Sequence, residues 1–286
     1  MSEKIYFNTS GKFSIKRKLV NITTRLHHTV APKHAKQFAK NLFLTPVRSK
    51  PINEEPSGLS KGEIATSEGM IKTYRLGQGP VWVLTHGWSG TASQFYPLMQ
   101  HIASRGFTAL AYDQPGHGLS GGAYGHIPGF VVCLEAVLDN TNDVAGLVGH
   151  SMGTASALEC RHAKIADCPL LLIAPVLDYL DNLFGSVSRS GYSMKLFEAI
   201  VEDLQEQYHY PINIVDPYAH LMNRSNNTYI VHDEKDKFTK YSVSVKAAEQ
   251  GERVTLVTTQ GQGHGRVMKS PQVMECFDKL IGLAAK

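Results

Sequence analysis

Short apolar runs recur along the chain and alternate with stretches in which apolar residues return every three or four positions. The short runs predict β-strands, and the longer spacing predicts α-helices. Apolar strands joined by helices are typical of a parallel sheet that is covered on both faces. The predicted strands are residues 63–67, 71–76, 81–84, 108–112, 144–148, 170–175, 228–231 and 254–257, and the predicted helices are residues 94–104, 130–138, 154–163, 241–250 and 271–285.

Only Glu68 and Gly69 separate the first two strands, and this pair predicts a hairpin turn. The later strands alternate with helices, so we expect an α/β fold with a mostly parallel, doubly wound sheet. After residue 175 the strand signal stops, and helical patterns occupy residues 195–208 and 217–222. We expect this insertion, residues 177–224, to form a small helical cap over the carboxyl edge of the sheet.

The first sixty residues are organised differently from the rest. Residues 1–30 show no clear periodicity, and no element is predicted there. Residues 31–44 predict an amphipathic helix, whose apolar face we expect to pack on its own domain, with a membrane surface as the alternative. Proline, glycine and serine mark residues 45–62 as a linker. These patterns divide the chain into a helical extension over residues 1–60 and a main domain over residues 61–286. The apolar stripe of the predicted helix consists of Ala35, Phe38, Ala39, Leu42 and Phe43.

Composition agrees with one large globular domain, because 42% of the 286 residues are hydrophobic and 19% are charged. The four cysteines show neither a Cys-x-x-Cys pair nor the spacing of zinc ligands, so we expect reduced thiols and no metal. The longest strongly apolar run, residues 169–177, is too short to span a bilayer. The N-terminus lacks the apolar core of a secretory signal, and we therefore expect a cytoplasmic protein.

Charge is distributed unevenly along the chain. Residues 1–50 contain eleven lysines and arginines but a single acid, Glu3, which gives a net charge of +10, whereas the remainder carries −6. Such a basic segment docks on its own domain, on anionic lipid or on nucleic acid. We find no interleaved aromatic residues and no DNA-reading motif, so no nucleic-acid partner is expected. A basic extension that is solvated or docked on the chain's own domain is favoured, and weak contact with an anionic membrane surface remains the alternative.

The main candidate for chemistry is the sequence Gly149-His150-Ser151-Met152-Gly153. It follows an apolar strand and precedes a helix, which is the setting of a serine nucleophile on a sharp turn. The flanking glycines leave room for that turn and allow a positive φ. A serine hydroxyl is a weak nucleophile at neutral pH, so it needs a histidine base that is oriented by a carboxylate.

A base and an acid are available further along the chain. Of the thirteen histidines, only His264 lies beyond the last predicted strand, where it sits in a glycine-rich loop. The preceding strand ends in three candidate acids, Asp233, Glu234 and Asp236. The order serine, acid, histidine matches one known arrangement of a catalytic triad.

These motifs occur together in one known family. Residues 62–286 resemble the α/β-hydrolase fold of esterases, lipases and peroxidase-like enzymes. His86-Gly87-Trp88 is similar to the family's oxyanion loop, and residues 113–120 are similar to its Asp-x-Pro-Gly-x-Gly-x-Ser turn. Residues 149–153 match the nucleophile turn of the family, and Gly263-His264 matches its catalytic-histidine loop.

The resemblance also implies roles for individual residues. The family's His-Gly-x-x-Asp sequence aligns with His232 and Asp236, which favours Asp236 as the acid and leaves Asp233, in place of the usual glycine, as the alternative. The backbone N–H groups of Trp88 and Met152 are expected to bind the oxyanion. The side chains expected to contact substrate are those of Trp88, Met152 and His150.

The predicted function is a cofactor-free serine hydrolase that cleaves a small-molecule carboxylic ester or thioester through an acyl-enzyme intermediate. Related enzymes that cleave carbon–halogen bonds or epoxides carry aspartate where this chain has Ser151, so the sequence argues against those activities. The same triad also serves carbon–carbon bond cleavage and perhydrolysis, which stay open. A non-catalytic ligand-binding or scaffold protein on this fold is the alternative from another class.

Overall fold

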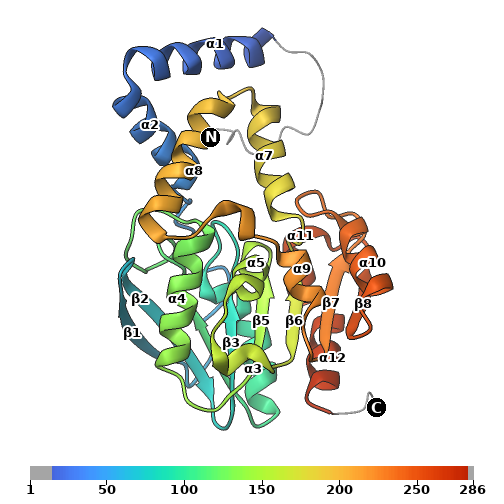
Figure 1. Ribbon diagram of the computed structural model, residues 1–286. Helices are drawn as coiled ribbons and strands as arrows, with labels where there is room; N and C mark the ends of the chain where they lie inside the picture. The colour runs from blue at the N-terminus through green and yellow to red at the C-terminus, as the bar shows by residue number, and fades with distance from the viewer. Residues whose placement is uncertain (1–14, 283–286) are drawn as a thin grey trace. The chain divides into compact units, whose positions relative to one another are not determined.

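The computed structural model describes residues 15–282 of the chain. Within these residues, eight strands form one sheet in the order β1-β2-β4-β3-β5-β6-β7-β8 (Figure 1). The pairs β1–β2 and β2–β4 are antiparallel, and all the other pairs are parallel. The predicted α/β fold and mostly parallel sheet are therefore confirmed. The strands are β1 Ser60–Thr66, β2 Gly69–Gly77, β3 Val81–Thr85, β4 Thr108–Tyr112, β5 Val144–His150, β6 Leu170–Ile173, β7 Thr228–Asp233 and β8 Val254–Thr259.

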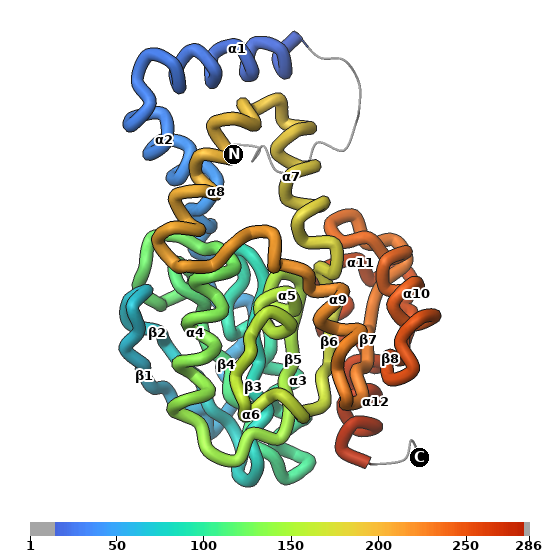
Figure 2. Tube along the Cα trace, in the orientation of Figure 1, coloured from blue at the N-terminus to red at the C-terminus, as the bar shows by residue number. Residues whose placement is uncertain are grey.

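Helices cover both faces of the sheet (Figure 2). On one face, α3 (Tyr96–Ser104) and α12 (Pro271–Leu280) pack against each other and supply Met99 and Phe277 to the core. The other face carries α4 (Ile127–Asp139), α5 (Met152–Glu159), α9 (Pro217–Met222) and α10 (Tyr241–Gln250). Every residue of β3, β4 and β6 is buried, because neither face of these strands reaches solvent. This burial explains the continuous apolar runs that mark them in the sequence. The shorter helices are η2 (Ala92–Phe95), α6 (Ala163–Ala166), α11 (Gly263–Arg266) and η4 (Val267–Lys269).

Some predicted boundaries were wrong. The helix expected over residues 154–163 begins at Met152, directly after the N-cap residue Ser151, and ends at Glu159. A separate short helix, α6, follows it. The last helix ends at Leu280 instead of residue 285, and residues 283–286 lie outside the described part of the chain.

The chain divides into two compact units, each with its own internal contacts. The described part of the first, here called the helical unit, comprises residues 15–45 and 178–216. The second, the sheet unit, comprises residues 46–177 and 217–282. The N-terminal segment and the inserted segment, which are far apart in sequence, thus fold together. The helical unit contains α1 (Ile15–Val30), α2 (Pro32–Leu44), α7 (Tyr179–Ser190), α8 (Met194–Tyr208) and η3 (Ile212–Ile214).

The apolar face of α2 packs against other residues of the helical unit. Phe43 packs edge-to-face on Tyr192 and Phe197, with ring centroids 4.7 and 5.3 Å apart. Lys36 and Lys40 of α2 both form ion pairs with Asp203 of α8, at 2.7 and 3.1 Å. The expectation that this helix packs on its own domain is confirmed, although one residue of the predicted stripe, Phe38, is 52% exposed.

Residues 15–30 form a regular helix, α1, so the absence of a predicted element there was wrong for the described residues. Its apolar residues do recur at helical spacing, but the basic run Lys16-Arg17-Lys18 obscures the pattern. Residues 1–14, for which the same expectation was stated, lie outside the described part of the chain. Within residues 15–282, no helix has the length and apolar character needed to cross a membrane.

The segment that composition marks as a linker is held against the sheet unit. The Arg48 guanidinium donates hydrogen bonds to the carbonyl oxygens of Gly118, Ser120 and Gly122, at 3.1, 2.7 and 2.9 Å. The Val47 N–H donates to the Ser89 hydroxyl at 3.0 Å. This segment therefore runs along the loops that follow β3 and β4.

Candidate active site

Ser151 occupies the junction between β5 and α5. Its backbone has φ 52° and ψ −127°, a conformation that side-chain-bearing residues adopt only when the surrounding structure enforces it. A Cβ at Gly153 would collide with the Thr85 carbonyl oxygen, and one at Gly149 would lie 2.9 Å from the Thr154 Cα. The two glycines are thus required because other backbone comes close to them. The positive φ falls on Ser151 itself and not on the glycines.

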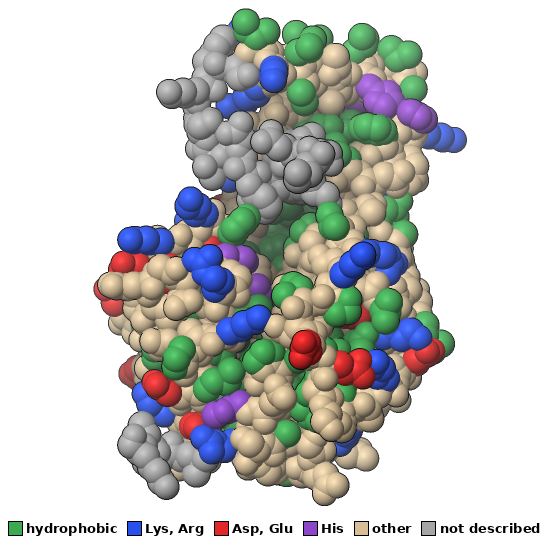
Figure 3. All heavy atoms as spheres, turned by 180° about the vertical axis from the view of Figure 1, so that it is seen from behind, with side chains coloured by type: hydrophobic (Ala, Val, Ile, Leu, Met, Phe, Trp, Pro, Cys, Tyr) green, Lys and Arg blue, Asp and Glu red, His purple; other side chains and the backbone are tan. Residues whose placement is uncertain are grey.

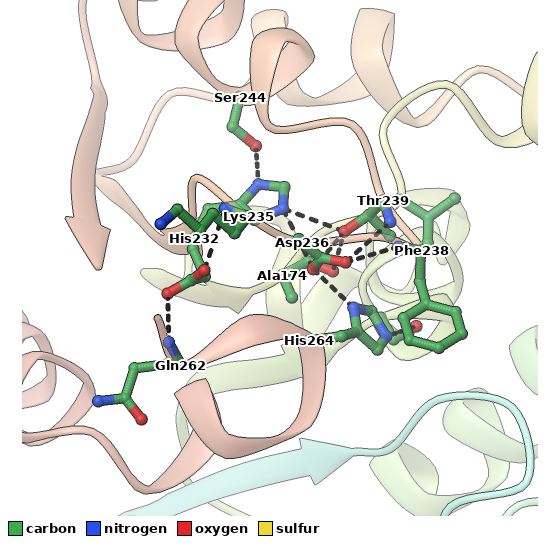
Figure 4. A network of polar contacts seen from close by, with 12 residues as sticks. Ala174, His232, Lys235, Asp236, Phe238, Thr239, Ser244, Gln262 and His264 are labelled. Carbon is green, nitrogen blue, oxygen red and sulfur yellow. Dashed lines mark hydrogen bonds and ion pairs between the residues drawn. The ribbon is translucent and has the colours of Figure 1, made fainter. Parts of the chain in front are cut away.

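His264 lies in α11, in the loop region that follows β8, and connects two other residues. Its Nε2 is 2.9 Å from the Ser151 Oγ, so it can accept the hydroxyl proton. Its Nδ1 is 2.7 Å from the Asp236 Oδ2 and donates to it (Figure 4). The structure therefore brings together Ser151, His264 and Asp236 in one chain of hydrogen bonds, from three strand ends that are distant in sequence.

The Asp236 carboxylate is buried and accepts several further hydrogen bonds. Phe238 N–H and Thr239 N–H donate to Oδ1 at 2.7 and 3.2 Å, and the Thr239 hydroxyl donates to Oδ2 at 2.9 Å. Burial alone raises the pKa of Asp236, but the hydrogen bonds from His232, His264 and the backbone outweigh it and hold that pKa well below its usual range. Asp236 is therefore ionised at neutral pH.

A second layer of polar side chains holds this carboxylate in place (Figure 4). The His232 Nε2 lies 3.1 Å from the Thr239 hydroxyl and 3.4 Å from the Asp236 Oδ2. On the other side of the ring, His232 Nδ1 lies 2.8 Å from the Ser244 hydroxyl. The sequence analysis missed Thr239 and Ser244, because nothing in their spacing links them to the triad.

Asp233, the alternative acid, has a different set of partners. Its Oδ2 accepts hydrogen bonds from the Thr259 hydroxyl at 3.0 Å and from Gln262 N–H at 2.7 Å, and its Oδ1 accepts from Lys235 N–H at 3.0 Å. These bonds tie the end of β7 to the loop that carries His264. Asp233 thus supports the position of the loop, whereas Asp236 contacts the imidazole.

The loop of residues 86–88 lies directly beside the nucleophile. A Cβ at Gly87 would be 2.6 Å from the Ser151 Cβ and 3.1 Å from its Oγ. Trp88 follows Gly87 in this loop, and Met152 is the first residue of α5, where backbone N–H groups have no partner within the helix. The two predicted oxyanion donors therefore belong to segments that flank the Ser151 side chain.

The remaining histidines near the site have structural partners. His86 is buried, donates from Nδ1 to the Gly87 carbonyl at 2.8 Å, and accepts at Nε2 from Gln114 N–H at 3.0 Å. Burial lowers the pKa of His86 to about 4. His150, a predicted substrate contact, is also buried, and its Nε2 lies 3.0 Å from the His264 carbonyl oxygen. These two side chains hold the loops on either side of the nucleophile.

The turn over residues 113–120 is held in place by hydrogen bonds to the Asp113 side chain. The Asp113 carboxylate accepts from the Tyr74 hydroxyl, Ala92 N–H and Leu119 N–H at 3.0, 2.8 and 2.9 Å. A Cβ at Gly118 would collide with this carboxylate, and Gly118 also has a positive φ of 45°. The motif therefore joins β2, β4 and the segment after the oxyanion loop. Within residues 15–282, no group of three His, Cys, Asp or Glu side chains is placed to hold a metal ion.

Comparison with known proteins identifies the family of the chain. The family model described as "Alpha/beta hydrolase family" matches residues 82–274, which include the loop beside Ser151, the nucleophile turn, Asp236 and His264. The chain belongs to the alpha/beta hydrolase family.

One relative is similar to this alpha/beta hydrolase over part of its length. The 2-(acetamidomethylene)succinate hydrolase of Mesorhizobium japonicum is 33% identical over 138 residues, which are 43% of this chain and 46% of that protein. The match therefore spans about half the length of that relative.

Two solved structures share the fold. Est1E from Butyrivibrio proteoclasticus, solved with ferulic acid bound, has a TM-score of 0.61 and 18% identity, covering 77% of this chain and 99% of Est1E. The Pyrococcus furiosus esterase Pf2001 has a TM-score of 0.63 and 20% identity, covering 83% of this chain and 98% of the esterase. At these identities the likeness concerns the fold alone.

Proposed function

We propose that this protein is a serine hydrolase that cleaves a carboxylic ester or thioester of a small molecule through an acyl-enzyme intermediate. The observation that carries the proposal is the pair of hydrogen bonds Ser151 Oγ–His264 Nε2 at 2.9 Å and His264 Nδ1–Asp236 Oδ2 at 2.7 Å. This arrangement makes a serine hydroxyl nucleophilic at neutral pH.

In the first half of the reaction, the Ser151 Oγ attacks the carbonyl carbon while His264 Nε2 takes the hydroxyl proton. The developing imidazolium is stabilised by the ionised Asp236, which already accepts a hydrogen bond from Nδ1. The negative charge on the carbonyl oxygen is received by the N–H groups of Trp88 and Met152. Collapse of the tetrahedral intermediate breaks the bond to the alcohol or thiol, which leaves with the proton from His264.

In the second half, water replaces the leaving group. His264 Nε2 takes a proton from the water while its oxygen attacks the acyl carbon. The second tetrahedral intermediate releases the carboxylic acid, and His264 returns the proton to the Ser151 Oγ. Water is consumed, and the free enzyme is restored without any further reactant. The same two residues thus act in both halves.

The buried environment of Asp236 supports its part in this cycle. Phe238 N–H, Thr239 N–H, the Thr239 hydroxyl and the His264 imidazole all donate to the carboxylate, and these hydrogen bonds keep it charged and fixed in orientation. A fixed anion of this kind holds His264 in the tautomer that leaves Nε2 free to accept a proton. Its role is therefore to orient the base and not to receive the proton.

The comparisons support ester or related hydrolysis as the class to be tested. One structural neighbour, Pf2001 of Pyrococcus furiosus, is named as an esterase, and another is a thioesterase domain from the curacin biosynthetic pathway. The sequence relative acts on 2-(acetamidomethylene)succinate according to its name, so that compound belongs in the substrate panel. The panel also contains p-nitrophenyl esters and acyl thioesters of increasing acyl length.

The test compares the wild-type protein with Ser151→Ala and with the control Ser57→Ala, which changes an exposed serine in the sheet unit. We expect the wild type and the control to hydrolyse at least one panel member and to be labelled by a fluorophosphonate probe. Ser151→Ala is expected to lose both. Labelling and hydrolysis that survive in Ser151→Ala would overturn the assignment, and a wild type that is neither labelled nor active would favour a binding or scaffold protein.

A further inference from the structure

The helix α1 carries a continuous row of exposed apolar side chains. Five apolar residues of α1 are between 61% and 82% exposed. At the α-helical rotation of 100° per residue they fall within a sector of about 80°. Figure 3 shows hydrophobic side chains along α1 at the top of the view. The residues of this row, here called the α1 stripe, are Ile15, Leu19, Ile22, Leu26 and Val30.

The opposite face of α1 is the one that binds the rest of the helical unit. Arg17 Nη2 donates to the Ser188 carbonyl at 2.8 Å, and Asn21 Nδ2 donates to the Gly191 carbonyl at 3.2 Å. Thr24 Oγ1 accepts from Ser193 N–H at 3.1 Å. A helix on a globular protein normally buries its apolar face and exposes its polar face. Here the polar face makes the internal contacts, and the α1 stripe points away from them.

The charges beside the stripe indicate what it contacts. On the helix, Lys16 lies on one side of the stripe, and Lys18 and Arg25 lie on the other. Residues 15–45 contain seven lysines and arginines and no acid. Two copies of α1 that paired through their stripes would bring these like charges together, which is unfavourable. An anionic surface complements them instead.

We propose that α1 is an interfacial helix that binds the surface of an anionic lipid membrane. The stripe enters the boundary between headgroups and acyl chains, while Lys16 and Arg25, one on each side of it, lie among the lipid phosphates. A helix that combines an apolar stripe with basic flanks binds such surfaces through buried apolar area and charge attraction together. This proposal concerns α1 alone and does not depend on the proposed catalytic function.

The test is a flotation assay of the full-length protein with vesicles of phosphatidylcholine mixed with phosphatidylserine. The stripe variant is Leu19→Gln/Leu26→Gln, whose two positions are both 61% exposed. The matched control is Ile52→Gln/Leu119→Gln, two apolar positions of the sheet unit that are 57% and 68% exposed. Glutamine is nearly as good a helix former as leucine, so the stripe variant is expected to keep the wild-type far-ultraviolet circular dichroism. The control is expected to keep it as well, because Ile52 and Leu119 lie outside the helices and strands.

We expect the wild type and the control to float with the mixed vesicles, and the stripe variant to bind at least about tenfold more weakly because two leucines no longer insert. A charge variant, Lys16→Gln/Arg25→Gln, is expected to lose binding by a similar factor. Binding should also weaken in high salt and on vesicles of phosphatidylcholine alone.

Three results would overturn the proposal. One is a stripe variant that floats as well as the wild type, and another is a wild type that binds phosphatidylcholine alone as well as it binds the mixture. The third combines two measurements: no flotation of the wild type, and sedimentation equilibrium that shows a dimer converted to a monomer by Leu19→Gln/Leu26→Gln. That result would assign the stripe to a second copy of the chain.

Discussion

Replacing Asp236 with asparagine keeps the size of a buried side chain and removes its charge and one of its acceptor atoms. The asparagine oxygen fits best at the Oδ1 position, where it accepts from Phe238 N–H and Thr239 N–H. The amide nitrogen then faces His264 Nδ1 and donates to it. His264 is forced into the tautomer that carries its proton on Nε2, and that nitrogen can no longer accept the Ser151 proton. The expected loss in kcat is about 10⁴-fold, or about 5 kcal/mol of barrier.

The matched substitution is Asp233→Asn, three residues away on the same strand end. Asp233 does not orient the imidazole, but its carboxylate accepts from Lys235 N–H on one oxygen and from Gln262 N–H and the Thr259 hydroxyl on the other. An asparagine leaves one of these donors unpaired, which costs about 1–3 kcal/mol of stability. We expect kcat to fall by about tenfold or less, because the loop carrying His264 shifts slightly while the triad stays chemically intact.

The assay is steady-state hydrolysis of the best ester of the panel, with active enzyme counted by fluorophosphonate titration and stability followed by urea unfolding. The result that supports the reasoning is a kcat at least about 100-fold lower in Asp236→Asn than in Asp233→Asn. Equal losses in the two variants, or an Asp236→Asn enzyme within tenfold of the wild type, would refute the assignment of the acid.

Three other predictions follow from buried contacts. Burial lowers the pKa values of His86, His117 and His150 from 6.5 to about 4, about 3 and about 3, so the unfolded state binds protons that the folded state excludes. The free energy of unfolding, followed by urea titration, should therefore fall by up to about 4 kcal/mol per unit as pH drops from 6.5 towards 4, and a flat profile would contradict this. Gly87→Ala should lower kcat by about 10²–10³-fold, because the added methyl group pushes the oxyanion loop away from Ser151. The control Gly185→Ala should leave kcat unchanged, because its methyl group meets only the end of the Arg189 side chain. Equal kcat values in the two variants would argue against the loop's role. Phe43→Ala should destabilise the helical unit by about 3–5 kcal/mol and speed hydrogen exchange in residues 15–45, and unchanged exchange there would show that α2 does not depend on this contact.

The parts of the fold that the sequence predicts well are those determined by local burial. The strands β3, β4 and β6 are buried on both faces, so their apolar runs are continuous and stand out from the surrounding pattern. The helix α10 was predicted with its bounds unchanged, residues 241–250, and Gly251 follows its last residue. Local patterns of this kind need no knowledge of distant contacts.

Other features depend on contacts between residues that are far apart in sequence. The orientation of α1 is set by hydrogen bonds to Ser188 and Gly191, about which residues 15–30 carry no information. The helix α7 was not predicted at all. The separate positions of Asp233 and Asp236 emerge only when β7, β8 and the His264 loop are placed side by side. Sequence order therefore indicated the candidate triad, and the family resemblance favoured Asp236 over Asp233, while the different hydrogen-bond partners of the two acids are visible only in the fold.

The most direct test of the central claim is to trap the acyl-enzyme. The protein is mixed with a p-nitrophenyl ester that it hydrolyses, quenched in acid within a single turnover, digested and examined by mass spectrometry. We predict that the acyl group is found on Ser151 and that Ser151→Ala carries none. Hydrolysis at the full wild-type rate with no acyl group on Ser151, or with the acyl group on another residue, would contradict the account.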